Sequence, residues 1–114
     1  MNISFKGIGD QYVTFAAAET AELGAVCKIS ANGTVDKCAA DDAFCGVIAE
    51  LRFGMAGVRM GGYVELPYTG TAPALGYTAL AADGEGGVKV PEKGGQTYLV
   101  ISVDTETQTV GLFL

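Results

Sequence analysis

The feature that most restricts the fold of this chain is an internal repeat. Four short motifs of the first half recur in the second half at an offset of 52 or 53 residues. The matched pairs are Leu23-Gly24 with Leu75-Gly76, Gly33-Thr34-Val35 with Gly86-Gly87-Val88, Val47-Ile48 with Val100-Ile101, and Gly57-Val58-Arg59-Met60 with Thr109-Val110-Gly111-Leu112. Each copy reads as strand, glycine turn, short strand, long strand, turn and strand. Two similar β-units, 23–60 and 75–114, are therefore expected to bury their apolar faces within one domain; chance similarity among Gly/Val-rich strands is the alternative.

The stretch 61–76 is expected to connect these two units. Residues 63–66 alternate outward and inward side chains, which predicts a short strand. Pro67 is expected to end that strand, because proline has no N–H to offer to a sheet ladder. Leu75-Gly76 then opens the second unit, so a hinge is expected at the centre of the chain.

The rest of the sequence also predicts strands rather than helices. Asn32-Gly33 is the strongest hairpin signal, because a type I′ turn needs two residues that tolerate positive φ. The nearly uniform apolar run 98–103 predicts a strand that is buried on both faces or central in its sheet. Residues 16–22 have helical propensity but no apolar stripe, so a loop or single turn is expected. Further strands are expected at 11–15, 25–30, 34–38, 44–53, 77–81 and 109–114. The expected class is an all-β small barrel or sandwich with little or no helix.

Composition limits the classes of partner. The chain has 114 residues, 13 acidic against 7 basic side chains and a net charge of −6. A protein without a basic patch is a poor ligand for nucleic acid or for an anionic membrane surface. The first residues show neither a basic leader nor a long apolar run, so the product is expected to be made and kept in a cytoplasm, or to be assembled there. Residues 1–10 are a candidate extended N-terminal arm.

Sequence motifs for catalysis are missing. The chain has no histidine, which excludes Ser-His and Cys-His nucleophile systems. No phosphate-binding loop is found, and the Gly84 to Gly87 run lies between expected strands and reads as a turn. Asp41-Asp42 is the one adjacent acidic pair; a solvated turn is expected there, with calcium binding as the alternative. We therefore expect no catalytic, cofactor or metal site, and no enzyme activity.

The three cysteines are Cys27, Cys38 and Cys45. An odd number in a chain without a secretion signal indicates free, buried thiols. If Asn32-Gly33 is a two-residue turn, Cys27 lies opposite Cys38, and a cross-strand disulfide becomes sterically possible. A metal site is disfavoured because the chain lacks histidine and any Cys-x-x-Cys spacing.

Several aromatic and arginine side chains are candidates for a protein interface. Arg52 and Arg59 flank the Gly54–Gly57 turn and could lie near each other. Arginine is favoured at interfaces, so an interface role is one interpretation, and a plain surface role is the alternative. Exposed tyrosines on strands could anchor a subunit contact, with packing in the core or rim as the alternative. The exposed-face candidates are Tyr63, Tyr68 and Tyr77; the N-terminal arm from Phe5 to Tyr12 completes the expected interface.

The spacing of glycine, valine and proline resembles the capsid cement, or decoration, proteins of tailed bacteriophages and prophages, over roughly residues 10 to 114. The residues that carry the resemblance are Leu23-Gly24-Ala25-Val26, Cys45-Gly46-Val47-Ile48-Ala49, Gly62-Tyr63-Val64-Glu65-Leu66-Pro67, Leu75-Gly76-Tyr77-Thr78, Leu99-Val100-Ile101 and Val110-Gly111-Leu112. The chain departs from the family pattern at two places. Val100-Ile101-Ser102 replaces a second Gly-Val-Ala motif, and Tyr77 replaces an acidic residue.

This resemblance implies a small, β-tulip-like structural protein on the exterior of an icosahedral shell, made in the cytoplasm of a bacterial host. Its implied partner is the major capsid protein, and its implied state on the shell is a homotrimer at local threefold positions. The interface residues expected in that case are Phe5, Tyr12, Arg52, Arg59, Tyr63 and Tyr68. Another virion role, such as a head-fibre base or tail component, and a small ligand- or carbohydrate-binding β module are the alternatives.

Overall fold

The computed structural model describes residues 11–114, and in this range the chain forms ten β-strands and no helix. The first five strands are β1 (Gln11–Ala17), β2 (Val26–Ala31), β3 (Thr34–Lys37), β4 (Gly46–Arg52) and β5 (Met55–Gly61). The second five are β6 (Tyr63–Thr69), β7 (Gly76–Ala82), β8 (Val88–Lys89), β9 (Gln96–Asp104) and β10 (Thr109–Phe113). The expected all-β class is confirmed.

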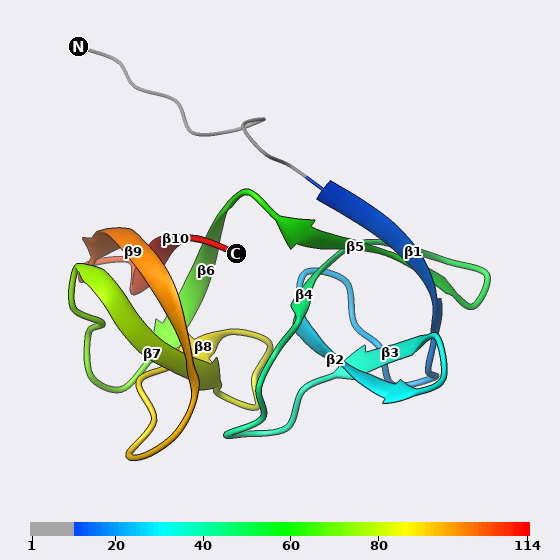
Figure 1. The fold of residues 1–114 in the computed structure, drawn as a ribbon, viewed down its shortest axis with the longest axis horizontal. Helices are drawn as coiled ribbons and strands as arrows, with labels where there is room; N and C mark the ends of the chain where they lie inside the picture. The colour runs from blue at the N-terminus through cyan, green and yellow to red at the C-terminus, as the bar shows by residue number, and fades with distance from the viewer. Residues whose placement is uncertain (1–10) are drawn as a thin grey trace, which may run out of the picture.

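The ten strands close into two small barrels, which lie side by side in Figure 1. The first barrel has the strand order β1-β3-β2-β4-β5, and the second has the same order in β6-β8-β7-β9-β10. In each barrel the first and third strands pair in parallel, and every other pair is antiparallel. A duplicated unit therefore builds the molecule, and its copies begin with β1 and β6, which the expected units 23–60 and 75–114 leave out.

Strand register shows how closely the barrels correspond. In the β4–β5 ladder Glu50 faces Gly57 next to a bulge at Ala49, and in the β9–β10 ladder Ser102 faces Gly111 next to a bulge at Ile101. Gly57 is thus equivalent to Gly111, which lies 54 residues later. The sequence alignment paired Gly57 with Thr109 and was wrong by two residues, because the β9–β10 turn is longer than the β4–β5 turn.

Pro67 lies inside β6 and does not end it, contrary to expectation. The N–H of Tyr68 donates to the carbonyl oxygen of Gln108 on the β10 side, at 3.0 Å. Successive N–H groups of a strand point to opposite sides, so the nitrogen of Pro67 points away from β10. It faces β8, whose pairing with β6 starts only at Tyr68, and no ladder bond is lost. The connection between the barrels is instead Gly62, with φ of 92°.

Two apolar clusters fill the structure. The smaller cluster occupies the first barrel and includes Cys27, Val35, Ile48, Ala56 and Val58. The larger cluster fills the second barrel and also takes in residues of the first barrel: Val26, Cys38 and Phe44. In β9 only Val100 is buried, so residues 98–103 are not buried on both faces. The strand is central, the other expected possibility, because it pairs with β7 on one side and β10 on the other. The last strand packs inward through Val110 and Leu112.

The loop between β3 and β4 fastens one barrel to the other. The N–H of Asp41 donates to the oxygen of Ala82 in β7, and the N–H of Ala82 donates to the oxygen of Asp42, both at 2.9 Å. Lys89 of β8 forms an ion pair with Asp41 at 2.9 Å. The ring of Phe44 stacks on Tyr98 of β9, with centroids 4.8 Å apart. The barrels are therefore held together by a continuous polar and apolar contact.

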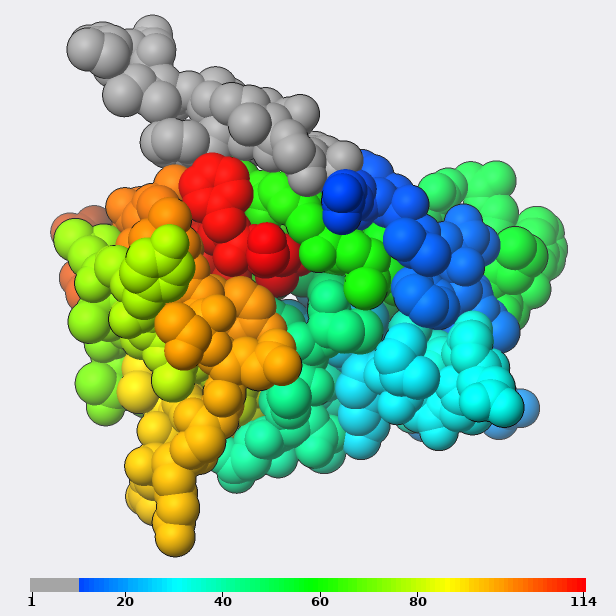
Figure 2. Space-filling view, in the orientation of Figure 1, coloured from blue at the N-terminus to red at the C-terminus, as the bar shows by residue number. Residues whose placement is uncertain are grey.

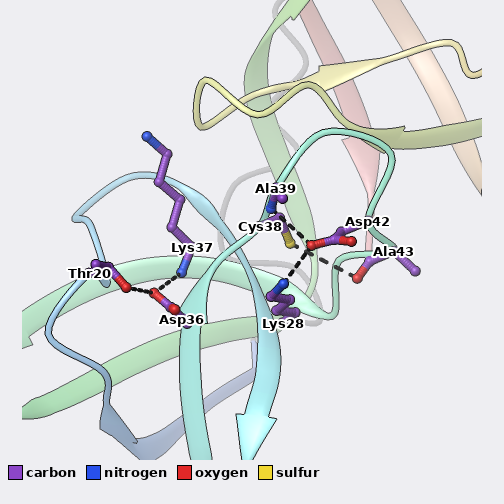
Figure 3. Close-up of polar contacts among 8 residues, drawn as sticks. All are labelled: Thr20, Lys28, Asp36, Lys37, Cys38, Ala39, Asp42 and Ala43. Carbon is purple, nitrogen blue, oxygen red and sulfur yellow. Dashed lines mark hydrogen bonds and ion pairs between the residues drawn. The ribbon is translucent and has the colours of Figure 1, made fainter.

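Asp42 holds this loop in shape, as Figure 3 shows. Its carboxylate accepts hydrogen bonds from Lys28 Nζ at 2.7 Å and from the N–H of Ala39 at 2.9 Å. These two donors keep the pKa of Asp42 below its ordinary value. The expected turn at Asp41-Asp42 is confirmed, and Asp41 is exposed to solvent, but both acids also bond to other parts of the fold.

Candidate functional site

Three of the six expected interface residues meet where the two barrels join. Arg59 of β5 donates from Nη1 to the carbonyl oxygen of Tyr63, the first residue of β6, at 2.8 Å. Its Nη2 donates to the hydroxyl of Tyr12 in β1, and its guanidinium lies 5.0 Å from the centroid of the Tyr12 ring. Arg59 therefore connects β1 to the start of the second barrel, and Tyr12 stays 54% exposed beside it.

Tyr63 and Tyr68 do not present their rings to a partner, because both are buried within the chain. Tyr63 packs edge-on against Phe113, donates from its hydroxyl to Glu65 at 3.0 Å, and has a pKa raised mainly by burial. Tyr68 lies in the larger apolar cluster. The expectation of exposed faces is thus wrong for both and right for Tyr77, which is 79% exposed. Phe5 lies outside the described residues.

Arg52 and Arg59 lie far apart, although the sequence allowed them to lie near each other. In the β4–β5 ladder Arg52 faces Met55 beside the turn, whereas Arg59 faces Val47 at the opposite end. Four residues of strand separate the two positions, roughly 13 Å. Arg52 instead forms an exposed ion pair with Glu50 at 3.0 Å.

The tip of the β4–β5 hairpin carries an apolar side chain that sequence reasoning missed. Phe53 is 98% exposed and has φ of 50°, and Gly54 after it has φ of 75°. These angles are those of a two-residue hairpin turn that normally selects Asn, Asp or Gly. Met55 and Leu51 beside the tip are also exposed. The signal in the sequence was a phenylalanine directly before a glycine at the centre of a hairpin pattern.

A hollow of about 270 Å³ opens beside this tip. Gly57 lines it without a side chain, and Thr14 of β1 lines it from the neighbouring strand. Its remaining lining residues are Glu50, Arg52, Phe53 and Met55. This hairpin forms part of the right-hand end of the molecule in Figure 2.

The thiols form a second distinct group. All three cysteines are free. Cys27 faces Lys37 instead of Cys38, because a bulge at Ser30 shifts the β2–β3 ladder by one residue. The expected free thiols are therefore confirmed, and the alternative of a Cys27–Cys38 disulfide is not realised. The N–H of Cys45 donates to the oxygen of Cys27 at 2.8 Å, which brings these two residues together. The neighbouring Cys27 thiol lowers the pKa of Cys45 to about 7, and the Cys45 thiol together with burial raises the pKa of Cys27. Burial raises the pKa of Cys38 to about 12.

We expect iodoacetamide to alkylate Cys45 first, with a rate that rises as the pH passes through about 7. The thiolate is the reactive form, and an ordinary cysteine reaches it near pH 8.5. The alkylation rate of each cysteine is measured by mass spectrometry of peptides after timed alkylation at several pH values. Cys45→Ser should remove the fast phase and leave the slow reaction of Cys27 and Cys38; a rate that rises only above pH 8.5 would contradict the lowered pKa.

Other features that point to chemistry are sparse. Among residues 11–114 no three His, Cys, Asp or Glu side chains are placed to hold a metal ion. A larger hollow of about 640 Å³ lies between loops of the two barrels, but the charges that line it are mixed: Asp41, Lys89, Glu92 and Lys93.

No membrane-spanning helix is found in the described part of the chain. No protein-family model, curated protein or solved structure matches this chain.

Proposed function

We propose that this protein is a structural virion component that binds the outer surface of a phage capsid and stabilises the shell. The observation that carries the proposal is the outward placement of large apolar side chains on both barrels. They are Tyr12, Val13, Leu23, Ile29, Leu51, Phe53, Met55, Leu75 and Tyr77. Large exposed side chains of this kind, aromatic ones above all, can serve as anchors in a contact with another protein. The choice of a capsid as the partner rests on the sequence resemblance.

Two of these side chains support a binding role on both barrels. Leu23 is 61% exposed and Leu75 is 68% exposed, and each directly precedes a glycine with positive φ, Gly24 or Gly76. The same exposed leucine therefore occurs at the equivalent point of each barrel. If these leucines were buried, packing in the core would explain why both barrels have one. Because both are exposed, a contact with another protein fits the repetition better.

The physical effect of such binding follows from mass action. A ligand that binds only the assembled shell stabilises each site by roughly 2.7 kcal/mol when its free concentration is 100-fold above the dissociation constant. The gain is multiplied over many equivalent sites, so weak individual contacts suffice. A closed threefold arrangement of copies would match a junction of three capsid subunits.

Sedimentation with capsid shells tests the proposal. The purified chain is mixed with expanded shells of the major capsid protein from the same genome and run on a density gradient. We expect co-migration with the shells, saturating at three copies per local threefold position, and no binding to isolated capsid subunits. Clean separation from expanded shells, or equal binding to subunits and shells, would count against the proposal.

A shortened chain extends this experiment to the N-terminal arm. Deleting residues 2–10, which lie outside the described range, is expected to abolish co-migration. A circular dichroism spectrum and melting temperature like those of the full chain would show that the barrels still fold. Undiminished binding by the shortened chain would remove the arm from the proposed interface.

A further inference from the structure

The tip of the β4–β5 hairpin is energetically unfavourable in an isolated chain. Phe53 is almost fully exposed to water and has a backbone conformation in which a bulky residue is an outlier. Asparagine or glycine would form the same turn without that strain and without an exposed ring. Strain of this kind is commonly retained at sites of function.

The second barrel provides an internal comparison. Its equivalent hairpin, between β9 and β10, turns through residues 105–108, which are threonine, glutamate, threonine and glutamine. Gln108 there has φ of 54°, close to that of Phe53, but its side chain is polar. The shared barrel fold therefore does not require an aromatic ring at this tip, and another reason must account for Phe53.

The hollow beside Phe53 has the size and the place to receive the same ring from another molecule. An enclosed cavity of about 150 Å³ can hold benzene, and this hollow has a volume of about 270 Å³. Ring and hollow belong to one hairpin. A twofold axis beside such a patch places each ring at the hollow of the other copy, which is the self-complementarity that an isologous contact requires.

The charges of the patch permit two copies to approach. The whole chain has a net charge of −6, which makes copies repel one another. The rim of the hollow instead has one acid and one base, Glu50 and Arg52, paired at 3.0 Å. The hairpin surface is thus locally neutral, and each charge can also meet its opposite on a twofold-related copy.

We propose that the β4–β5 hairpin is a contact between two copies of this chain, in which Phe53 of each copy enters the hollow of the other. Thr14 and Gly57 leave the room that the entering ring fills. This contact is independent of the proposed capsid role, since it needs no shell and can be measured in solution.

Analytical ultracentrifugation of the full chain over a wide concentration range tests the contact. We expect a concentration-dependent dimer, and Phe53→Ser should weaken its association at least about tenfold, as for truncation of a central aromatic anchor. Tyr77→Ser removes another exposed aromatic side chain, 79% exposed on the second barrel, and should leave association unchanged. Circular dichroism confirms that each variant is folded.

A mixing experiment tests the reciprocal geometry. Thr14→Trp should fill the hollow and also weaken the dimer. Phe53→Ser removes one wall of the hollow but leaves the space at Thr14 and Gly57 open, and Thr14→Trp retains the ring. A mixture of the two should therefore form a heterodimer through one restored contact, detected by native mass spectrometry. The proposal is overturned if the wild-type chain stays monomeric up to its solubility limit, if Phe53→Ser associates as tightly as wild type, if Tyr77→Ser weakens association equally, or if the mixture forms no heterodimer.

Discussion

Replacing Phe44 with alanine is expected to lower the free energy of unfolding by about 3–5 kcal/mol. Phe44 is 2% exposed and stacks on Tyr98, whose hydroxyl also donates to the Phe44 carbonyl oxygen at 2.9 Å. The ring belongs to a loop of the first barrel but packs in the core of the second. Both barrels wall the resulting cavity, so neither can close it alone. The expected drop in melting temperature is roughly 12–20 °C.

Phe53→Ala is the matched control, because it removes the same ring from a position that is 98% exposed. Its effect on the unfolding free energy should stay within about 0.5 kcal/mol. Urea denaturation of both variants, at a concentration where the wild-type chain is monomeric, measures the difference. Similar losses in the two variants would contradict the role of Phe44 in joining the barrels.

Gly46→Val is expected to destabilise the first barrel by about 3 kcal/mol, the upper part of the usual range for overpacking. A Cβ at Gly46 would lie 2.5 Å from the carbonyl oxygen of Arg59 and 2.7 Å from Cγ1 of Val58. The first of these atoms belongs to the backbone of β5 and cannot rotate away. To relieve the clash, the backbone of β5 must move at Arg59, the residue that contacts Tyr12 and Tyr63.

Gly57→Ala, in the same pair of strands, is the control for this substitution. The nearest atom to a Cβ there is Glu50 Cβ, at 3.3 Å, which a small shift can accommodate. We expect a change below about 1 kcal/mol. Chemical denaturation, followed by tyrosine fluorescence or circular dichroism because the chain has no tryptophan, compares the stabilities of the two variants. A Gly46→Val variant as stable as Gly57→Ala would contradict the close approach of β4 and β5 at Gly46.

The candidate site was only partly readable from the sequence. Arg59 was chosen as an arginine beside the Gly54–Gly57 turn and Tyr12 as the end of the N-terminal arm, and the structure brings them into contact. Tyr63 was chosen as a tyrosine on an expected exposed strand face and is buried, because Phe113 from the far end of the chain covers it. Phe53 was missed, although its place before Gly54 marked a turn, because the exposure of a ring depends on what the rest of the fold leaves uncovered.

By itself the sequence determined the all-β class, the Asn32-Gly33 turn and the existence of two related halves. These features follow from alternation and turn chemistry, which act between neighbouring residues. The tertiary structure decided the register, including the bulges at Ser30 and Ala49, and the place of Pro67 inside β6. It also decided that the loop after β3 docks on the second barrel. These outcomes depend on contacts between residues far apart in the chain, whose packing no local pattern encodes.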